Sequence, residues 1–372
     1  MRVTLIDDEP LALELLERQI MKVTNAEIIK LTYLDLDKQA DLINNTDLIF
    51  LDIEMPGING LELADYIFEM NPHLQIVFVT AFNQYAVQAF ELNALDYLLK
   101  PVQLERLKKT FERLNVSKVP VTIPLSSKLQ IKVCGELMFE QNGESNVVQW
   151  RTAKTQELFL FLLYHNEKIV RKSELVELLW SNFELERAYS QLYTTIYNIR
   201  KTLNKYGNHL IIKSVQDGYK LIRKDVSIDI EEWEDRIMKA PPIHIETVDI
   251  YEEIMKLYTD AFLHSYDYVW AESERFRLEN LWLKIANKIG DIYTRNNRLE
   301  EAVKWYVKIC NLKPDDEQAN FSLMKLYAEL DYGLLVNHQY AQLEKALKDI
   351  DIVINSKIRQ WYMDWRELKS KS

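Results

Sequence analysis

The sequence predicts a multidomain protein that begins with a doubly wound α/β domain, continues through a mixed segment and ends in an all-helical domain. Its 372 residues suffice for two or three domains, and an apolar fraction of 48% can fill several cores. Short apolar runs alternate with longer amphipathic stretches up to about Leu114, whereas beyond about Ile228 the apolar residues recur at helical spacing. We therefore expect a parallel sheet first and a helical array last.

The N-terminal segment alternates predicted strands with predicted helices. Such alternation is typical of a parallel sheet with helices on both faces. In these sheets the functional crevice lies beyond the carboxyl ends of the strands. The predicted strands are Val3–Ile6, Leu48–Leu51, Ile76–Val79 and Tyr97–Leu99, and the clearest helices are Leu11–Val23 and Gly60–Met70.

Polar residues follow these strands where each strand ends. Asp7 and Asp8 follow the first strand, Asp52 the second, Thr80 the third and Lys100 the last. Carboxylates gathered at one edge repel one another, and a divalent cation such as Mg²⁺ relieves that repulsion. With an amine and a hydroxyl nearby to bind phosphoryl oxygens, an ionised Asp52 is a candidate nucleophile for phosphoryl transfer.

The segments LIDDEP, LIFLDIEMPGINGLEL, VFVTAF and ALDYLLKP closely resemble the receiver domain of two-component response regulators. The resemblance covers the first 114 residues and implies a sensor histidine kinase as partner. It also implies a function for each site residue: Asp52 as phosphoacceptor, Asp8 as a direct Mg²⁺ ligand, Asp7 acting partly through water, the backbone carbonyl of Glu54 as a further ligand, Thr80 and Tyr97 as the switch pair, and Lys100 beside the phosphoryl group.

Haloacid-dehalogenase-type phosphatases are an alternative, because they also use a nucleophilic Asp with Thr and Lys. Their motif places a second Asp two residues after the nucleophile. Here that position is Glu54, and the acidic pair lies 45 residues upstream of Asp52. The sequence therefore favours the receiver interpretation.

The net charge of −11 is unevenly distributed along the chain. Residues 1–115 carry −9 and residues 226–372 carry −7, but residues 128–225 carry +4. Nucleic acid responds to local rather than total charge, so the middle segment is the candidate for DNA binding.

The middle segment has predicted strands at both ends and three predicted helices between them. The strands are Leu129–Phe139, Val147–Trp150, Leu210–Lys213 and Tyr219–Arg223, and the helices are Thr152–His165, Ser173–Trp180 and about Arg187–Lys205. In the third helix Leu192, Ile196, Ile199 and Leu203 form one apolar stripe. At 100° per residue the opposite, exposed face would present candidate DNA contacts at Ser190, Thr194, Tyr197, Asn198, Lys201 and Lys205.

The last two strands flank Asp217-Gly218, a strong hairpin-turn signal. Lys213 and Lys220 make this hairpin basic and are further candidate DNA contacts. The segment resembles the OmpR-like winged helix-turn-helix of SARP-type activators, through RTAKTQELFLFLLYHNEKIVRKSELVELLW, LYTTIYNIRKTL and SVQDGYKL. Tyr193 and Asn198 depart from that pattern, since many relatives have arginines there.

The C-terminal helices repeat at tetratricopeptide-like distance. Predicted helices are Leu278–Arg295, Leu299–Leu312, Asp315–Leu330 and Tyr340–Leu347. The segment resembles the bacterial transcriptional activator domain of SARP-type regulators, notably in LEEAVKWYVKICNLKPDDEQANFSLMKLYAEL. Relatives often have a proline near the last helix, where this chain has Asn355-Ser356.

The predicted domains are 1–115 (receiver), 116–127 (linker), 128–226 (winged helix) and 227–372 (helical repeats). Together they predict a cytoplasmic, phosphorylation-controlled regulator that binds promoter DNA, with Mg²⁺ as cofactor. We expect no membrane contact, and no enzymatic activity beyond transfer of phosphate to Asp52 and its slow hydrolysis. Phosphorylation is expected to favour a homodimer, and RNA polymerase is a further candidate partner. The alternative is a phospho-switched interaction scaffold without DNA binding.

Overall fold

The structure is a computed structural model that describes residues 1–33, 41–71, 74–82, 85, 92, 94–114, 128–215 and 217–370. By its internal contacts the chain divides into two compact units. The first comprises Met1–Leu129 and Val148–Val226, and the second comprises Gln130–Val147 and Ser227–Ser372. The predicted linker, residues 116–127, lies outside the described residues.

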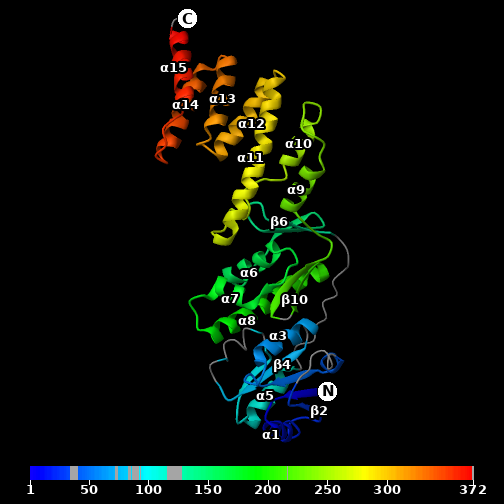
Figure 1. Cartoon of the computed structure of the whole chain (residues 1–372). Coiled ribbons are helices and arrows are strands. Elements are labelled where there is room, and N and C mark those ends of the chain that lie inside the picture. The colour runs from blue at the N-terminus through cyan, green and yellow to red at the C-terminus, as the bar shows by residue number, and fades with distance from the viewer. Residues whose placement is uncertain are drawn as a thin grey trace. The chain divides into compact units, whose positions relative to one another are not determined.

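The N-terminal α/β part of the first unit contains a five-stranded parallel sheet in the order β2-β1-β3-β4-β5 (Figure 1). Its strands are β1 (Arg2–Ile6), β2 (Glu27–Leu31), β3 (Leu48–Leu51), β4 (Gln75–Thr80) and β5 (Asp96–Leu99), and its helices include α1 (Pro10–Ile20), α3 (Gly60–Met70) and α5 (Leu104–Leu114). The doubly wound prediction is confirmed, and β2 is a strand that the sequence did not reveal.

Strand residues alternate between two cores, one on each face of the sheet. Phe50 packs with Leu13 of α1 and Phe111 of α5, whereas its neighbour Leu51 packs with Ile67 of α3. This period of two follows from the pleat, which points successive side chains to opposite faces. Helices on both faces therefore leave the carboxyl edge of the sheet free for polar side chains.

The rest of the first unit is a helix–hairpin part, residues 148–226. Its helices are α6 (Ala153–Tyr164), α7 (Lys172–Trp180), α8 (Leu185–Leu203) and the short η1 (Asn204–His209), and its strands are β9 (Val170–Arg171), β10 (Leu210–Val215) and β11 (Gly218–Arg223). The strands form an antiparallel sheet in the order β10-β11-β9. All four residues of the predicted α8 stripe are buried, which confirms that this face is core.

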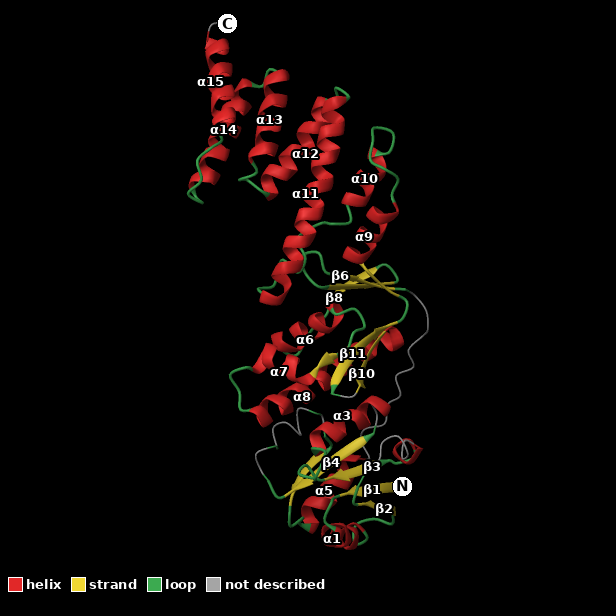
Figure 2. Ribbon diagram, viewed as in Figure 1, coloured by secondary structure: helices red, strands yellow, loops and turns green. Residues whose placement is uncertain are grey.

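The second unit joins a small sheet to a helical array, whose helices are drawn red in Figure 2. The four-stranded sheet, in the order β12-β6-β7-β8, contains β6 (Leu129–Lys132), β7 (Met138–Gln141), β8 (Glu144–Val147) and β12 (Val226–Ile228). The helices are α9 (Asp229–Lys239), α10 (Val248–Met255), η2 (Val269–Ala271), α11 (Glu272–Arg295), α12 (Leu299–Leu312), α13 (Glu317–Glu329), α14 (Gly333–Lys348) and α15 (Ser356–Ser370).

Strand β8 is shifted from the predicted Val147–Trp150. Asn142 and Gly143 both have positive φ, 56° and 81°, and their tight turn pairs Gln141 directly with Glu144. Asn-Gly is the preferred pair for this hairpin geometry. The turn therefore fixes the register and ends the strand at Val147.

The small sheet is tied to the helical array by a buried carboxylate. Asp229, at the start of α9, accepts hydrogen bonds from the backbone N–H groups of Val133 and Cys134, each at 3.0 Å. The backbone of Gly135 also donates to Ala261 at 2.9 Å. The segment predicted as one domain, 128–226, thus contributes its first strands to one unit and its helices to the other.

Within the array, each helix from α11 to α14 packs on the next. The Tyr306 ring of α12 lies against Gly290 of α11, where a Cβ atom would come within 2.9 Å of it. Its hydroxyl donates to Asp291 at 2.7 Å. This close antiparallel packing confirms the all-helical prediction. None of the helices that the structure describes is both long and apolar enough to cross a bilayer.

Candidate functional sites

Three carboxylates meet at the carboxyl edge of the parallel sheet. Oxygen atoms of Asp7, Asp8 and Asp52 lie within 4.8 Å of one another. Asp7 and Asp52 are buried, and Asp8 is half-buried. Because β1 and β3 are adjacent and parallel, their C-terminal residues emerge side by side. The strand-end positions predicted from the sequence are therefore brought together as expected.

Lys100 bridges two of these acids. Its Nζ atom lies 2.8 Å from Asp7 Oδ2 and 2.8 Å from Asp52 Oδ2. Burial lowers the pKa of Lys100, but hydrogen bonds and charge from Asp52 and Asp7 outweigh burial and leave this pKa above its ordinary value. The ammonium group thus stays charged at neutral pH.

The negative charge of the three carboxylates is only partly compensated by Lys100. Burial, with a smaller contribution from the charge of Asp52, raises the pKa of Asp7 despite its hydrogen bonds from Lys100 and from the backbone of Glu9. One amine does not neutralise three carboxylates. A hard divalent cation with oxygen ligands fits this donor set, and Mg²⁺ commonly binds through one or two carboxylates with water completing its shell.

The predicted switch residues Thr80 and Tyr97 are both buried and share a neighbour. The Thr80 hydroxyl accepts a hydrogen bond from the backbone N–H of Phe82 at 3.4 Å, and the Tyr97 hydroxyl donates to the Phe82 carbonyl oxygen. Burial, helped by Tyr85 and the charge of Asp52, raises the pKa of Tyr97 to about 12. Tyr97 is therefore an inward-facing, neutral hydrogen-bond donor.

The side chain of Glu54 is not one of the grouped acids. Its carboxylate accepts a hydrogen bond from the Tyr85 hydroxyl at 3.4 Å, and the side chain is exposed. Metal coordination by its backbone carbonyl stays a prediction.

Gly60 connects the Asp52 backbone to helix α3. A Cβ atom at this position would lie 2.0 Å from the Asp52 carbonyl oxygen, so no other residue fits without movement. The Gly60 N–H also donates to the Ile53 carbonyl oxygen at 2.7 Å, and Asn59 caps the helix by accepting from Leu61 N. Helix α3 therefore begins in direct contact with the Asp52 backbone.

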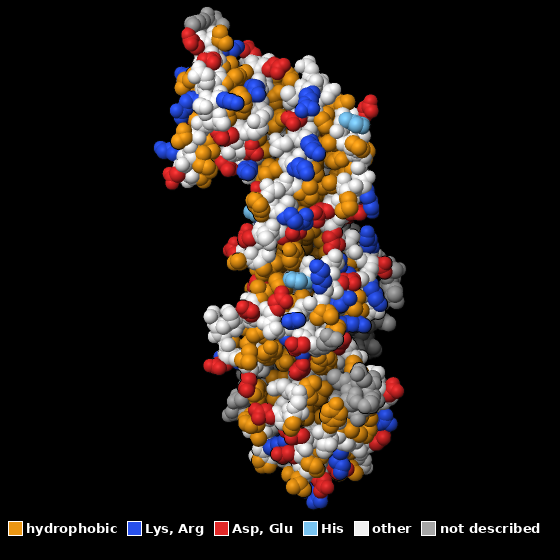
Figure 3. All heavy atoms as spheres, viewed as in Figure 1, with side chains coloured by type: hydrophobic (Ala, Val, Ile, Leu, Met, Phe, Trp, Pro, Cys, Tyr) orange, Lys and Arg blue, Asp and Glu red, His pale blue; other side chains and the backbone are white. Residues whose placement is uncertain are grey.

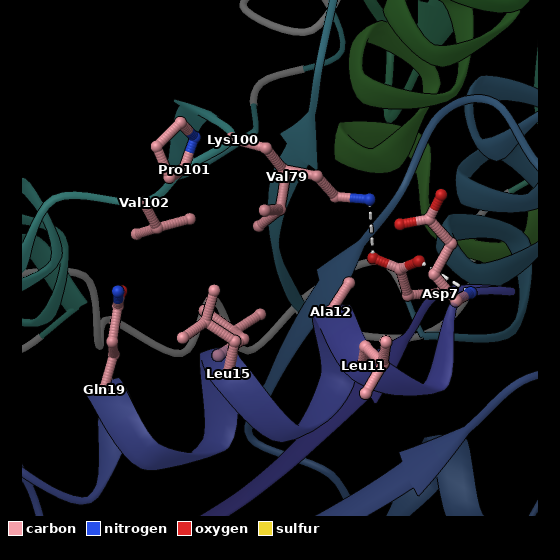
Figure 4. A pocket seen from close by; sticks show the side chains of 11 residues that line it. Asp7, Leu11, Ala12, Leu15, Gln19, Val79, Lys100, Pro101 and Val102 are labelled. Carbon is pink, nitrogen blue, oxygen red and sulfur yellow. Dashed lines mark hydrogen bonds and ion pairs between the residues drawn. The ribbon is translucent and has the colours of Figure 1, made fainter.

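A cavity of about 400 Å³ lies beside the acid cluster, between α1 and the end of β5 (Figure 4). Figure 4 shows Asp7 and Lys100 joined at its edge, with Leu11, Ala12 and Leu15 of α1 along its floor. The cavity is mainly apolar apart from that charged edge.

The predicted DNA-reading face of α8 is largely buried in this structure. Ser190, Thr194 and Asn198 are 3%, 4% and 8% exposed, so the prediction that they lie on an exposed face is wrong here. Ser190 Oγ donates to the Glu186 carbonyl oxygen, and Asn198 accepts from Arg151 at 3.4 Å. Their availability to DNA stays a prediction that requires this face to open.

Helix α3 of the α/β part packs on α8 through the tyrosines of α8. The Tyr197 ring of α8 packs on Phe68 of α3, with ring centroids 5.0 Å apart. Tyr193 is 6% exposed and belongs to the core cluster that contains Ile67 and Phe68, with Tyr189 packed against it. The sequence pattern of α8 alone gives no sign of this second apolar contact, because aromatic residues suit either exposed or buried helix faces.

The predicted basic contacts are more accessible. Lys201, Lys205 and Lys213 are exposed, and Lys220 is half-buried with Glu167 at 4.0 Å. Lys213 and Lys220 are direct cross-strand neighbours in the β10–β11 hairpin. Like charges placed opposite each other destabilise a hairpin, so this pair fits an anionic ligand. Lys and Arg side chains gather over the part of Figure 3 that holds this hairpin.

Comparison with known proteins identifies the domain around Asp52. Residues 3–112 match the family described as "Response regulator receiver domain". Residues 3–112 form a receiver domain. An uncharacterized response regulatory protein of Vibrio vulnificus is 45% identical over 115 residues, which are 30% of this chain and 46% of the relative. The chain thus spans about half the length of the curated relatives it matches.

Solved receiver structures are similar over the same region. The response regulatory domain of mrkE from Klebsiella pneumoniae is 38% identical, covering 31% of this chain and 95% of that one, with a TM-score of 0.28. Response regulator TrrA from Thermotoga maritima, crystallised with Mg²⁺ and BeF, is 32% identical, covering 30% and 97%, with a TM-score of 0.28. Residues 148–221 match the family "Transcriptional regulatory protein, C terminal", so the helix–hairpin part is an OmpR-type winged helix.

Four residues that shape these contacts were not singled out from the sequence. Asp65, Glu69 and Arg200 pair across the junction of the receiver domain and the winged helix, whereas Gly60 contacts the nearby backbone of Asp52 and Ile53. Gly60 follows a run typical of a helix start, and a glycine there signals a close backbone approach. Charged residues on a predicted helix are usually solvated, and the spacing of the three charged residues offers no sign of pairing.

Proposed function

We propose that this chain is a phosphorylation-controlled DNA-binding transcription regulator that accepts phosphate on Asp52. The observation that carries the proposal is the Lys100 ammonium group 2.8 Å from the carboxylates of both Asp7 and Asp52. A half-buried lysine between a nucleophilic carboxylate and further acids suits the charge that develops during phosphoryl transfer. The receiver domain and the winged helix supply the two functions that such a regulator needs.

The chemistry follows from the positions of these groups. One carboxylate oxygen of Asp52 attacks the phosphorus atom of the donor, and the new O–P bond forms as the bond to the leaving atom breaks, with the electron pair going to that atom. Lys100 then faces the oxygens of the transferred group. Mg²⁺, which Asp7, Asp8 and Asp52 would hold, supplies positive charge that offsets theirs. Backbone donation from Ile53 to Asp52 Oδ1, at 2.7 Å, keeps the carboxylate oriented.

The switch residues give the modification a structural consequence. Phosphorylation replaces the single negative charge of the Asp52 carboxylate with the roughly two negative charges of the phosphoryl group, so the net gain is about one. The Thr80 hydroxyl, now bound to the Phe82 backbone, is a donor for the new oxygens, and its rotation would break a contact that also positions Tyr97. We therefore propose Thr80 and Tyr97 as the residues that relay the change, with a phosphorylated homodimer as its product.

A sensor histidine kinase is the proposed phosphoryl donor. Leu11 and Leu15 of α1 are 80% and 52% exposed although they are large and apolar, and they border the cavity beside Asp7. A helical partner bound there would bring its phosphorylated side chain to Asp52.

Promoter DNA is the proposed ligand of α8 and of the β10–β11 hairpin. Both cysteines, Cys134 and Cys310, are free and buried, which suits the reducing cytosol.

The proposal is tested by labelling the full chain with acetyl phosphate. Intact-mass measurement should show one phosphoryl group on the wild type in the presence of Mg²⁺, and none after chelation with EDTA. Asp52→Asn should take up none under either condition. Equal labelling of the wild type and Asp52→Asn would contradict the assignment of the acceptor. Binding of the same samples to a DNA duplex tests the proposed DNA-binding function. Absence of binding in every sample would favour an interaction scaffold without DNA binding.

A further inference from the structure

Helix α3 of the receiver domain carries three acids on the side that meets the winged helix. Glu62, Asp65 and Glu69 follow one another at spacings of three and four residues, which places them along one helix face. Asp65 is only 1% exposed, although it lies on a surface helix of its own domain. A carboxylate buried to this extent requires strong hydrogen-bond donors around it.

Arg200 of α8 supplies the strongest of these donors. Its Nη1 atom lies 2.5 Å from Asp65 Oδ1 and 3.0 Å from the Asp65 carbonyl oxygen, and its Nη2 atom lies 3.1 Å from Glu69 Oε2. The Nε atom donates to the Ile212 carbonyl oxygen of β10 at 3.1 Å. The winged helix therefore holds one edge of the guanidinium group and presents its outer edge to α3.

The hairpin β10–β11 adds three more donors. The Ser214 backbone N–H donates to Glu69 Oε2 at 2.6 Å, and its hydroxyl donates to Asp65 Oδ2 at 3.2 Å. The Tyr219 hydroxyl donates to the same Asp65 oxygen at 2.8 Å. Burial, followed by the charge of Asp65, raises the pKa of Tyr219 well above its ordinary value, so this hydroxyl keeps its proton.

Lys172, at the start of α7, completes the set. It is 2% exposed and pairs with Glu62. The Tyr193 and Tyr219 rings lie 5.3 Å and 5.8 Å from its Nζ atom. Burial lowers the pKa of Lys172, but Glu62, Tyr66 and Asp65 outweigh burial and raise it. Every carboxylate that the structure places against Lys172 or Arg200 comes from α3.

These donors are of the kinds that contact nucleic-acid phosphates. Guanidinium, ammonium, hydroxyl and backbone N–H groups are the usual partners of phosphate oxygens. Here they come from α7, α8, β10 and β11, which are the helices and the hairpin of the winged helix. They converge on the space between the proposed recognition helix and the hairpin, where DNA lying against both elements would place its backbone.

We propose that α3 acts as an internal substitute for DNA phosphates, with Glu62, Asp65 and Glu69 occupying the anion-binding groups of the winged helix until the receiver domain moves away. This inference rests on the proposed function, since it presumes that the winged helix binds DNA. Binding of α3 and binding of DNA then exclude each other, because both require Arg200, Lys172 and the Ser214 N–H.

The energetics suit a reversible contact. Buried ion pairs lose hydration that roughly offsets their attraction, so such a cluster contributes little net stability while it remains specific. Tethering of both domains on one chain makes even a weak contact well populated. The contact is also linked to the phosphoacceptor, because α3 begins at Gly60 against the Asp52 carbonyl oxygen. A change at Asp52 is thereby transmitted to the start of the helix that carries the three acids.

The test compares DNA binding by the unphosphorylated full chain and by the double variant Asp65→Asn/Glu69→Gln. These substitutions keep the side-chain shapes and remove the two charges that face Arg200. Affinity for a mixed-sequence duplex should rise about tenfold or more, within the range typical of coupling between sites. The matched control is Glu105→Gln/Glu112→Gln, which removes two exposed receiver charges from α5 and should change affinity far less.

The outcomes separate this inference from the proposed function. In one outcome, beryllofluoride with Mg²⁺ strengthens DNA binding by the wild type, but the double variant binds DNA no better than the untreated wild type. The proposal that α3 replaces DNA phosphates is then wrong, and the proposed function stands. If no sample binds DNA, both are wrong. Hydrogen exchange provides a second measurement that requires no DNA: the Ser214 amide should exchange faster in the double variant than in the wild type, and unchanged protection would overturn the inference.

Discussion

The two ionic clusters of the first unit are built from similar groups but differ in where their members come from. At Asp52, the acids and Lys100 lie at strand ends of a single sheet. At Asp65, the acids belong to the receiver domain and Arg200 belongs to the winged helix. The first cluster is therefore fixed by the fold of one domain, whereas the second exists only while two domains are in contact. That difference suits the proposed phosphoacceptor site, which is permanent, and the proposed contact with α3, which can be released.

The largest effect is expected at Gly60, which connects the Asp52 backbone to the helix that carries Asp65. Gly60→Val places side-chain atoms where a Cβ atom alone would already lie 2.0 Å from the Asp52 carbonyl oxygen. We expect a loss of about 3 kcal/mol or more in the free energy of unfolding, measured by urea denaturation. The backbone of Asp52 and the backbone at the start of α3 would have to move apart to make room for the side chain.

Gly57→Ala is the matched control for this substitution. Gly57 has a φ of +92° but no atom within 4 Å of an added Cβ, so only backbone strain opposes the change. A loss of about 1 kcal/mol is expected there. An equal effect of the two substitutions would show that the Gly60 contact is not what constrains the start of α3.

A second prediction concerns the unbalanced charge of the cluster formed by Asp7, Asp8 and Asp52. Because burial raises the pKa of Asp7 in the folded state, its contribution to stability is greatest at acid pH and is lost as pH rises through that pKa. At neutral pH, Mg²⁺ should therefore raise the melting temperature of the wild type. Asp7→Asn should melt higher than the wild type without metal and gain less from Mg²⁺. Equal gains would exclude Asp7 from the metal site.

A third prediction concerns Lys213 and Lys220, which are proposed to contact DNA. These lysines are exposed or half-buried and make no contact with α3 among the hydrogen bonds and ion pairs described for them, so they should act only on DNA. Lys213→Ala should lower the slope of log affinity against log salt by about one phosphate contact. Lys239→Ala, which removes an exposed lysine of α9, is the control and should leave the slope unchanged.

The smallest expected effect is that of Tyr97→Phe. This variant removes the hydrogen bond to the Phe82 carbonyl oxygen but keeps the ring in the receiver core. A loss of about 1 kcal/mol in unfolding free energy is expected, because one buried hydrogen bond contributes that much. Acetyl phosphate labelling at Asp52 should be retained. Loss of labelling would place Tyr97 in the chemistry rather than in the relay.

The sequence was sufficient to predict that Asp7, Asp8, Asp52 and Lys100 meet, because they stand at the ends of apolar runs and parallel strands gather their ends. It was also sufficient for the buried stripe of α8. It did not reveal β2, whose residues Glu27–Leu31 are only partly buried and show no clear alternation. Nor did it reveal the burial of Ser190, Thr194 and Asn198, since burial also depends on residues distant in the sequence, such as Arg151 beside Asn198. Local periodicity reports one buried face and is silent about a second.

The central claim is that the state of Asp52 sets the affinity of the winged helix for DNA. It is tested most directly by titrating one DNA duplex with the full chain, at fixed salt and with Mg²⁺ throughout, in the presence and absence of beryllofluoride. The account predicts tighter binding by the wild type with beryllofluoride and no response from Asp52→Asn. The same affinity for the wild type under both conditions, with beryllofluoride bound, would contradict it.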